Sequence, residues 1–233
     1  EALKGHPDQK IHLLSGRKGD SEGRTIRYQD LLEPTDRFAH ALYEMGVRKG
    51  DRVAIMLPDS FQYIVTFLAA SRIGAIVTNI DTFSAPAELK NQLAISKPKV
   101  IVMLDEFYPR LTEVRQAIPS LGHIILTGRN DFVAPSEERP EERDDVKYFT
   151  RLLETFSPRV PEVQVDSDEA VLAFTGGVTG SSKAAELTHR NLISAALQRA
   201  VWLFRDADPT QEVVMADLPY YHSYGLVAGL LMA

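Results

Sequence analysis

The sequence predicts an α/β fold in which a parallel sheet is flanked by helices. Short apolar segments rich in valine and isoleucine alternate with segments whose apolar residues repeat at helical spacing. The apolar segments lack the polar alternation that marks a half-exposed strand, so both faces of these strands should be covered. Strands that alternate with helices in this order form a parallel sheet through right-handed crossovers.

The expected elements follow from local signals at their ends. A helix should begin near Pro34 and end at Gly46, because its apolar residues recur at i, i+3, i+4 and i+7. Ser60 is a suitable N-cap for a second helix, which Gly74 ends, and Thr188 is the expected N-cap of a later one. In chain order, strands are expected at residues 24–28, 53–57, 75–80, 100–104, 123–126 and 170–174, and helices at 34–45, 61–73, 86–96, 111–118, 146–156, 192–204 and 225–233.

The composition is that of an ordinary globular domain and excludes several classes of function. Of 233 residues, 44% are hydrophobic and 25% are charged. A net charge of −6 gives no basic surface, so nucleic acid is not expected as a partner. The absence of cysteine excludes disulfides and thiolate metal sites, and four of the histidines show no mutual metal-ligand spacing: His6, His12, His40 and His123. With no signal peptide and no apolar run near about 18 residues, we expect a cytoplasmic protein; contact with a membrane surface and a homodimer stay open.

Residues 1–233 are expected to be one part of a longer protein. The chain starts at Glu1 rather than at a methionine, and it ends within the apolar segment 225–233. Residues 128–147 are charged and contain prolines, so we expect a solvated surface insertion there. Trp202 lies among apolar residues at helical spacing and is expected in the core.

A segment rich in glycine, hydroxyl and lysine residues follows the apolar strand at 170–174. It reads Thr175-Gly176-Gly177-Val178-Thr179-Gly180-Ser181-Ser182-Lys183. Glycines let backbone N–H groups approach an anion, hydroxyls donate to its oxygens, and a lysine adds a positive charge. The spacing fits neither G-x-x-x-x-G-K-[ST] nor G-x-G-x-x-G. From the residues alone, a phosphate-binding loop and a flexible strand-to-helix turn are both open.

Residues 175–191 resemble the phosphate-binding signature of the adenylate-forming enzymes, a superfamily of acyl- and aryl-CoA ligases, luciferases and amino-acid adenylation domains. That signature is approximately [YF]-T-[SG]-G-[ST]-T-G-x-x-K-G, followed by L-T-H-x-N. The residues that match it are Thr175, Gly177, Thr179, Gly180, Lys183, Leu187, Thr188, His189 and Asn191. Two positions depart, since Val178 replaces a hydroxyl residue and Ala184 replaces a glycine. The missing hydroxyl removes one charge-assisted donor worth roughly 1.5–3 kcal/mol.

Three further blocks resemble the same superfamily, in the same order along the chain. Residues 46–60 resemble G-V-x-x-G-D-R-V-A-[IL]-x-[LM]-P-N-S, and residues 67–77 resemble a block F-L-A-x-x-x-[IL]-G-A-[VI]-x. Residues 218–225 resemble L-P-[LM]-[FY]-H-x-x-G. The doublet Gly176-Gly177 is similar to that of medium- and long-chain fatty acyl-CoA ligases. The matched blocks run from about residue 24 to the end of the chain.

The resemblance implies a set of site residues. The segment that would bind the phosphates of ATP comprises Thr175, Gly176, Gly177, Val178, Thr179, Gly180 and Lys183. His222 would be a catalytic residue at the mouth of the acyl pocket, whereas His189, at a helix start, is interpreted as structural. The resemblance places the magnesium-binding glutamate, the adenine and ribose contacts and a catalytic lysine beyond Ala233, so no metal ligand is assigned in this chain.

The implied activity is that of an AMP-forming acid–thiol ligase. A carboxylic acid would be activated by ATP, with Mg²⁺, to an acyl-adenylate and then transferred to CoA. The chain would be the N-terminal part of the large AMP-binding domain, expected to be inactive alone because the later residues lie outside it. A fatty acid is favoured as the substrate, and a coumarate-like aryl acid is the alternative. A non-catalytic relative with a weakened ATP loop also stays open, on the strength of Val178 and Ala184.

Overall fold

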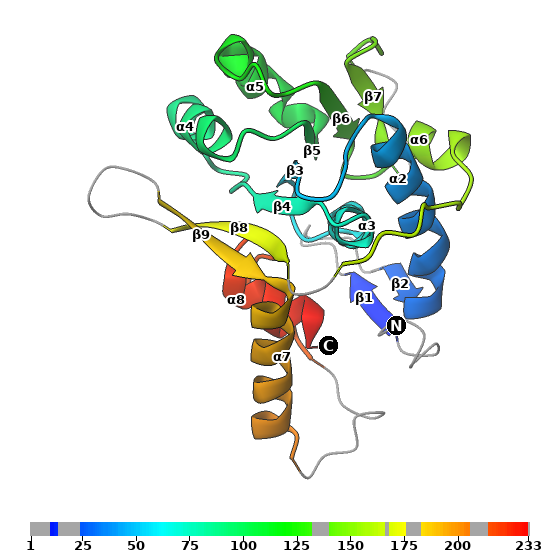
Figure 1. The fold of residues 1–233 in the computed structure, drawn as a ribbon, viewed down its shortest axis with the longest axis vertical. Helices are drawn as coiled ribbons and strands as arrows, with labels where there is room; N and C mark the ends of the chain where they lie inside the picture. Colours follow the sequence, from blue (N-terminus) through cyan, green and yellow to red (C-terminus); the bar gives the residue numbers. More distant parts are fainter. Residues whose placement is uncertain are drawn as a thin grey trace.

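A mixed, mostly parallel sheet forms the centre of the computed structural model, which describes residues 10–13, 24–131, 140–165, 168–175, 183–205 and 214–232 (Figure 1). Within these ranges, seven strands pair in the order β7-β6-β5-β3-β4-β8-β9. All pairs are parallel except β8–β9, which is antiparallel. The strands are β3 (Arg52–Met56), β4 (Ile76–Asn79), β5 (Val100–Leu104), β6 (His123–Thr127), β7 (Val146–Tyr148), β8 (Glu169–Thr175) and β9 (Lys183–Thr188). The predicted α/β class is therefore confirmed, with one antiparallel edge strand added to the predicted parallel sheet.

A two-stranded antiparallel ribbon and a set of helices surround this sheet. The ribbon pairs β1 (Lys10–Leu13) with β2 (Arg24–Arg27). The helices are α2 (Leu32–Glu44), α3 (Phe61–Arg72), α4 (Pro86–Ser96), α5 (Tyr108–Val114), α6 (Phe149–Thr155), α7 (His189–Leu203), α8 (Ser223–Gly225) and the π-helical η4 (Leu226–Leu231), with 3-10 turns η1 (Tyr28–Leu31), η2 (Asp105–Phe107) and η3 (Arg115–Ala117). Within the described ranges, no helix combines the length and the apolar character needed to cross a membrane.

The predicted helix ends are present in the structure. The Ser60 hydroxyl accepts a hydrogen bond from the Tyr63 amide at 3.2 Å, as expected of the N-cap of α3. Gly46 and Gly74 follow α2 and α3 with φ of +83° and +70°, a conformation that favours glycine. The predicted bounds of α4 and β5 coincide with the observed ones.

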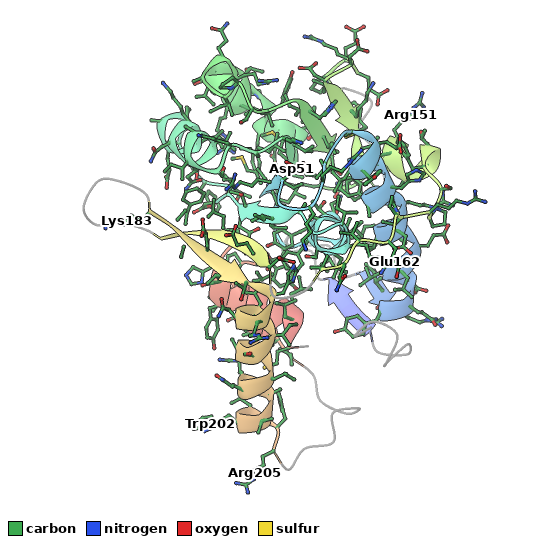
Figure 2. The ribbon with its side chains drawn as sticks, in the orientation of Figure 1. Asp51, Arg151, Glu162, Lys183, Trp202 and Arg205 are labelled. Carbon is green, nitrogen blue, oxygen red and sulfur yellow. The ribbon has the colours of Figure 1, made fainter. Side chains whose placement is uncertain are left out.

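Two predictions about the second half of the chain were wrong. Residues 146–156 do not form one helix, because Val146 pairs with Ile124 in the sheet and only the residues from Phe149 onward form α6. Within the predicted charged insertion 128–147, residues 132–139 lie outside the described residues, and the last two positions belong to β7. Trp202 is not in the core: it is 85% exposed near the end of α7, well away from the sheet (Figure 2). The buried residues of α7, Leu192 and Ala196, lie in its first half.

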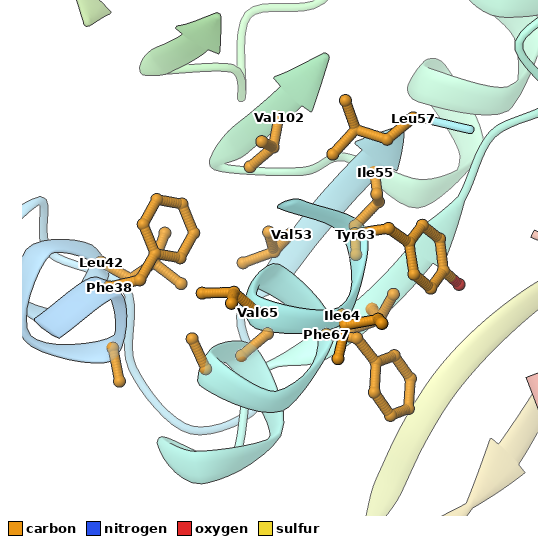
Figure 3. Packing of buried hydrophobic residues seen from close by; sticks show 14 of the residues in the cluster. Phe38, Leu42, Val53, Ile55, Leu57, Tyr63, Ile64, Val65, Phe67 and Val102 are labelled. Atoms are coloured by element: carbon orange, nitrogen blue, oxygen red, sulfur yellow. The ribbon is translucent and has the colours of Figure 1, made fainter. Parts of the chain in front are cut away.

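Alternate residues of the central strands face two separate hydrophobic layers. Val53 and Ile55 of β3 pack in one cluster with α2, α3 and α6, and Figure 3 shows the α2 residues Phe38 and Leu42 beside this face. Ala54 and Met56, which point to the opposite face, pack in a second cluster with α4 and α5. Both faces of the central strands are therefore covered by helices, as their uninterrupted apolar sequences predict.

Candidate functional site

The carboxyl edge of the sheet is the part of the fold where a ligand site is expected. The chain leaves β3 toward α3 on one face and leaves the neighbouring strand β4 toward α4 on the other. In open α/β sheets, ligands bind outside the carboxyl ends of strands at such a divergence. Three segments meet this edge: the turn after β3, the end of β4, and the chain around Tyr220, which hydrogen-bonds to both.

The glycine-rich segment connects the two strands of a hairpin. Thr175 ends β8 and lies directly opposite Lys183, the first residue of β9. The parallel pairing of β8 with β4 covers only Val171 and Leu172, so the hairpin extends beyond the sheet as a two-stranded arm with Lys183 at its far end (Figure 2). Because β8 runs parallel to β4, the arm leaves from the carboxyl edge. Residues 176–180, the remainder of the predicted phosphate-binding set, lie outside the described residues.

The chain reaches α7 through β9 rather than directly from the glycine-rich segment. We expected Lys183 on the approach to a helix, but Lys183 is the first of six strand residues and its side chain is exposed. The helix itself begins as predicted. The Thr188 hydroxyl accepts from the Asn191 amide at 3.1 Å, and the Asn191 side chain accepts from the Thr188 amide at 3.0 Å, which forms a reciprocal capping box.

Tyr220 is held at three points by residues from the carboxyl edge. Its amide donates to Oδ1 of Asp59, in the turn after β3, at 2.7 Å. Its carbonyl oxygen lies 2.8 Å from the hydroxyl of Tyr63, and that hydroxyl is also 2.9 Å from Oδ1 of Asn79 at the end of β4. The buried Tyr220 ring packs against the Tyr63 ring with 5.5 Å between centroids. The bonds from Tyr220 to Asp59 and Tyr63 join parts of the chain that are more than a hundred residues apart.

Burial at this cluster shifts the titration of its side chains. Burial raises the pKa of the Tyr220 hydroxyl to about 12, and nearby Asp59 adds to that shift. Burial also raises the pKa of the Asp59 carboxyl, although the hydrogen bond from the Tyr220 amide acts in the opposite direction. The Tyr221 hydroxyl has a raised pKa, first because of partial burial and then because of the charge of Asp81 and the hydrogen bond with it.

His222 lies two residues beyond this anchored position, on a tight turn. Its amide donates to the carbonyl of Pro219 at 3.0 Å, and its Nδ1 accepts from the amide of Tyr224 at 3.2 Å. A nitrogen that accepts cannot carry the proton, so the neutral ring is protonated on Nε2. The side chain of His222 is exposed. It therefore presents an Nε2–H donor to solvent at the carboxyl edge of the sheet.

The same turn explains why glycine stands three residues after His222. A Cβ at Gly225 would lie 2.2 Å from the carbonyl oxygen of Pro219 and 2.5 Å from that of Leu218. Only a residue without a side chain fits there. The Arg199 guanidinium of α7 lies 4.6 Å from the centroid of the Tyr224 ring, which also ties the turn to the helix that follows the hairpin.

Sequence reasoning proposed His222 and Lys183 as site residues but did not point to the residues that hold the His222 turn. Asp59 lies within a block that resembles the ligase superfamily, yet its role depends on a contact across 161 residues. Tyr63 and Asn79 look like ordinary members of an apolar helix and strand, and only their burial and hydrogen bonds distinguish them. A buried tyrosine hydroxyl must find a partner, which is the one sequence signal that was available.

Away from the carboxyl edge, the described residues form a hollow but no metal-ligand cluster. No group of three or more histidine, aspartate or glutamate side chains there could hold a metal ion, so no magnesium ligand set is assigned to them. A hollow of about 600 Å³ lies at the opposite edge of the sheet, where β6 begins at His123. Its lining combines Glu44, Glu142 and Asp144 with Lys147 and Arg151, and it does not include any predicted site residue.

Comparison with protein families decides the membership of this chain. The family model described as "AMP-binding enzyme" matches residues 1–233. The chain belongs to the AMP-binding enzyme family. Similar curated proteins include the long-chain-fatty-acid–CoA ligases of Salmonella typhimurium, at 33% identity over 90% of this chain, and of Bacillus subtilis, at 28% over 88%. The 4-coumarate–CoA ligase CCL1 of Humulus lupulus is 28% identical over 90% of the chain.

Solved structures agree with the family assignment. ATP-bound MatB from Rhodopseudomonas palustris superposes with a TM-score of 0.74 at 25% identity, covering 91% of this AMP-binding chain. The anthranilate CoA ligase AuaEII, solved with anthranoyl-AMP, has a TM-score of 0.77 and covers 99%, but at 19% identity it supports the fold alone. The chain spans only 36–41% of the length of these relatives.

Proposed function

We propose that this chain is the ATP-binding N-terminal part of an AMP-forming acyl-CoA ligase. In the proposed reaction, a carboxylate oxygen attacks the α-phosphate of ATP and the bond to pyrophosphate breaks, which leaves an acyl-adenylate. The thiolate of CoA then attacks the acyl carbon and AMP leaves. The observation that carries the proposal is the hairpin in which Thr175 faces Lys183 across the glycine-rich segment, at the same sheet edge as the His222 turn.

The hairpin is suited to holding a polyphosphate. Its two strands bring a threonine and a lysine to the two ends of a segment that contains Gly176, Gly177 and Gly180. The exposed Lys183 ammonium would neutralise charge on the departing pyrophosphate, and the glycines would let backbone amides approach it. The role of the arm is therefore electrostatic: it stabilises a leaving group and forms no covalent bond.

His222 would act on the other reactant. With Nδ1 occupied by the Tyr224 amide, its Nε2–H is available to donate to an oxygen of the acid or of the α-phosphate. Such a bond would orient the carboxylate for attack and stabilise charge that develops on the phosphorus-bound oxygens.

A fatty acid is the substrate class we propose. Two relatives in this family with which the chain shares 28–33% identity are long-chain-fatty-acid–CoA ligases. An aryl acid is the second candidate, since a 4-coumarate–CoA ligase is 28% identical. The Gly176-Gly177 doublet favours the fatty acid.

The test is acid-dependent exchange of labelled pyrophosphate into ATP, measured on the longer protein that contains this chain. Octanoate, palmitate, coumarate and several amino acids are compared. Exchange with the fatty acids alone is the expected result, and exchange with coumarate alone would select the aryl candidate. A folded protein that exchanges with none of them would contradict the proposal and favour a non-catalytic relative.

The contribution of Lys183 can be measured in the same assay. Loss of one charge-assisted contact of about 1.5–3 kcal/mol should lower kcat/KM for ATP roughly 10–150-fold in Lys183→Ala. Lys183→Arg, which keeps the charge, should retain more activity than Lys183→Ala. Lys90→Ala, an exposed lysine on α4, is the matched control and should leave the kinetics unchanged. Equal activity of Lys183→Ala and the control would remove Lys183 from the proposed site.

The alternative of a weakened ATP loop has its own variant. Val178 stands where the superfamily signature has a hydroxyl, so Val178→Thr restores a potential phosphate donor. A rise in ATP affinity of around tenfold, ~1.4 kcal/mol, would indicate that the natural loop is weakened. Unchanged affinity would indicate that backbone amides carry the binding.

A further inference from the structure

We propose that Asp59 and Tyr63 are positioning residues that fix the orientation of His222 by clamping Tyr220. This inference rests on the proposed function for the role of His222, but the clamp itself is a statement about geometry. The clamp holds the two backbone polar groups of Tyr220. The Asp59 carboxylate accepts from its amide at 2.7 Å, and the Tyr63 hydroxyl lies 2.8 Å from its carbonyl oxygen.

The two clamp residues come from a rigid part of the fold. Asp59 stands directly before Ser60, the N-cap of α3, and Tyr63 is in the first turn of that helix. Tyr63 is fully buried, and its hydroxyl is held from a second side by Asn79 at 2.9 Å. The position of the Tyr63 side chain is therefore set by α3 and by the end of β4, whereas Asp59 lies on the exposed turn that leads into α3.

The path from the clamp to the imidazole is short and has little freedom. His222 donates its amide to Pro219, the residue before Tyr220, at 3.0 Å. Leu226 donates its amide to the carbonyl of His222 at 2.9 Å, and the Gly225 backbone packs directly on the Pro219 carbonyl. A displacement of Tyr220 must therefore move the turn that brings the Tyr224 amide to Nδ1 of His222.

A purely structural role would predict a different pattern of effects. If Asp59 and Tyr63 only stabilised the fold, removing their bonds would lower stability and leave the imidazole of the folded protein unchanged. If they position His222, the folded variants should lose the single Nε2–H tautomer that the contact with the Tyr224 amide selects. The tautomer of the ring is therefore the decisive measurement.

The experiment records the imidazole ¹⁵N resonances of His222 in the 233-residue chain by NMR, assigned with His222→Gln. Asp59→Ala removes the acceptor of the Tyr220 amide, and Tyr63→Phe removes the hydroxyl while keeping the ring. Asp59→Asn keeps an oxygen acceptor in the same place and should restore the wild-type resonances. Asp36→Ala is the matched control, because it removes a carboxylate that pairs with Arg72 on the surface, away from Tyr220.

We expect separate Nδ1 and Nε2 resonances of one tautomer in the wild type, Asp59→Asn and Asp36→Ala, and averaged resonances in Asp59→Ala and Tyr63→Phe. A wild-type tautomer retained in both Asp59→Ala and Tyr63→Phe would overturn the clamp. Should Asp59→Ala fail to fold, Tyr63→Phe alone decides between these results. The same averaging in Asp59→Asn would also overturn it, since an acceptor would then not be the property that matters.

The turnover of the longer protein separates this inference from the proposed function. Misplacing a catalytic side chain should lower kcat roughly 10–100-fold in Asp59→Ala while KM for ATP changes little. Averaged His222 resonances with unchanged kcat would leave the clamp in place and overturn the role of His222 in acid activation.

Discussion

Gly225 shows how one residue fixes the shape of the candidate site. A Cβ there would lie 2.2 Å from the Pro219 carbonyl oxygen, which is backbone and cannot move aside without displacing the turn. Gly225→Ala should therefore lower the free energy of unfolding by about 1–3 kcal/mol, the usual cost of overpacking. Denaturant titration of the 233-residue chain measures it.

Gly122→Ala is the matched control for this variant. Its Cβ would meet the Lys99 carbonyl at 3.6 Å, an ordinary contact, so the change should stay below about 1 kcal/mol. Equal effects of the two substitutions would show that the turn around Gly225 has room for a Cβ, contrary to the structure.

His189 links stability to pH. Its Nε2 is buried without a hydrogen-bond partner among the described residues, and burial lowers its pKa below the ordinary 6.5, against the opposing effect of Asp168. The unfolded chain therefore takes up a proton at His189 before the folded chain does. The contribution of His189 to stability is fully present above pH 6.5 and is lost as the pH falls from 6.5 to the lower folded pKa.

The pH dependence of unfolding tests this sign. Between about pH 7.5 and pH 5.5, the wild type should lose more unfolding free energy than His189→Gln, which cannot titrate. His40→Gln is a control, because the His40 ring, unlike that of His189, has partners at both nitrogens: one is hydrogen-bonded to the Ser157 carbonyl and the other lies 3.9 Å from Glu44. A smaller loss in the wild type than in His189→Gln would mean that the folded state holds the charged form.

At the scale of elements, the N-cap of α7 is a feature that the sequence predicts and the structure contains. The Thr188 hydroxyl accepts from the Asn191 amide at the first turn of the helix. Thr188→Ala should lower the unfolding free energy by about 1 kcal/mol, and Thr188→Ser, which keeps the hydroxyl, should recover most of that loss. Thermal unfolding followed by circular dichroism measures both. Equal losses in the two variants would show that the hydroxyl is not the stabilising group.

Local signals were sufficient to predict the elements from α2 to β6. Pro86 opens α4, Gly46 and Gly74 end their helices, and Ser60 caps α3, as each residue type favours. These contacts lie within a few residues of one another. The residues that determine where these helices begin and end are therefore close together in the sequence, and the ends can be predicted from it.

Elements that depend on distant partners were harder to predict. Val146 to Tyr148 are a strand because β6 offers a free edge, and the local sequence contains no trace of that edge. Likewise, residues 183–188 form β9 because they pair with β8, and the glycine-rich segment between the two strands does not predict that pairing. The clamp on Tyr220 is the extreme case, since Asp59 and Tyr63 reach it across more than 150 residues.

At the scale of the whole molecule, the apolar residues of the central sheet are covered, whereas some apolar residues of α7 are not. Both faces of the central strands are covered by helices. On α7, by contrast, Ile193, Leu197 and Val201 recur every four residues and are all exposed. That spacing aligns them along one side of the helix. Trp202 follows Val201 in the sequence, so its fluorescence can report on the surroundings of this part of α7.

Trp202 is the only tryptophan in the 233 residues, so the intrinsic fluorescence excited selectively in tryptophan reports on α7 alone. At 85% exposure, its indole should emit at the long wavelength of free tryptophan amide and be readily quenched by iodide in the folded chain. Unfolding in guanidinium should then shift the emission very little, while the far-ultraviolet circular dichroism is lost. A blue-shifted, protected emission in dilute chain would contradict the exposure. A blue shift that grows with protein concentration would instead show that chains associate through this side of α7, because apolar surface exposed at such a stripe is stabilised by burial.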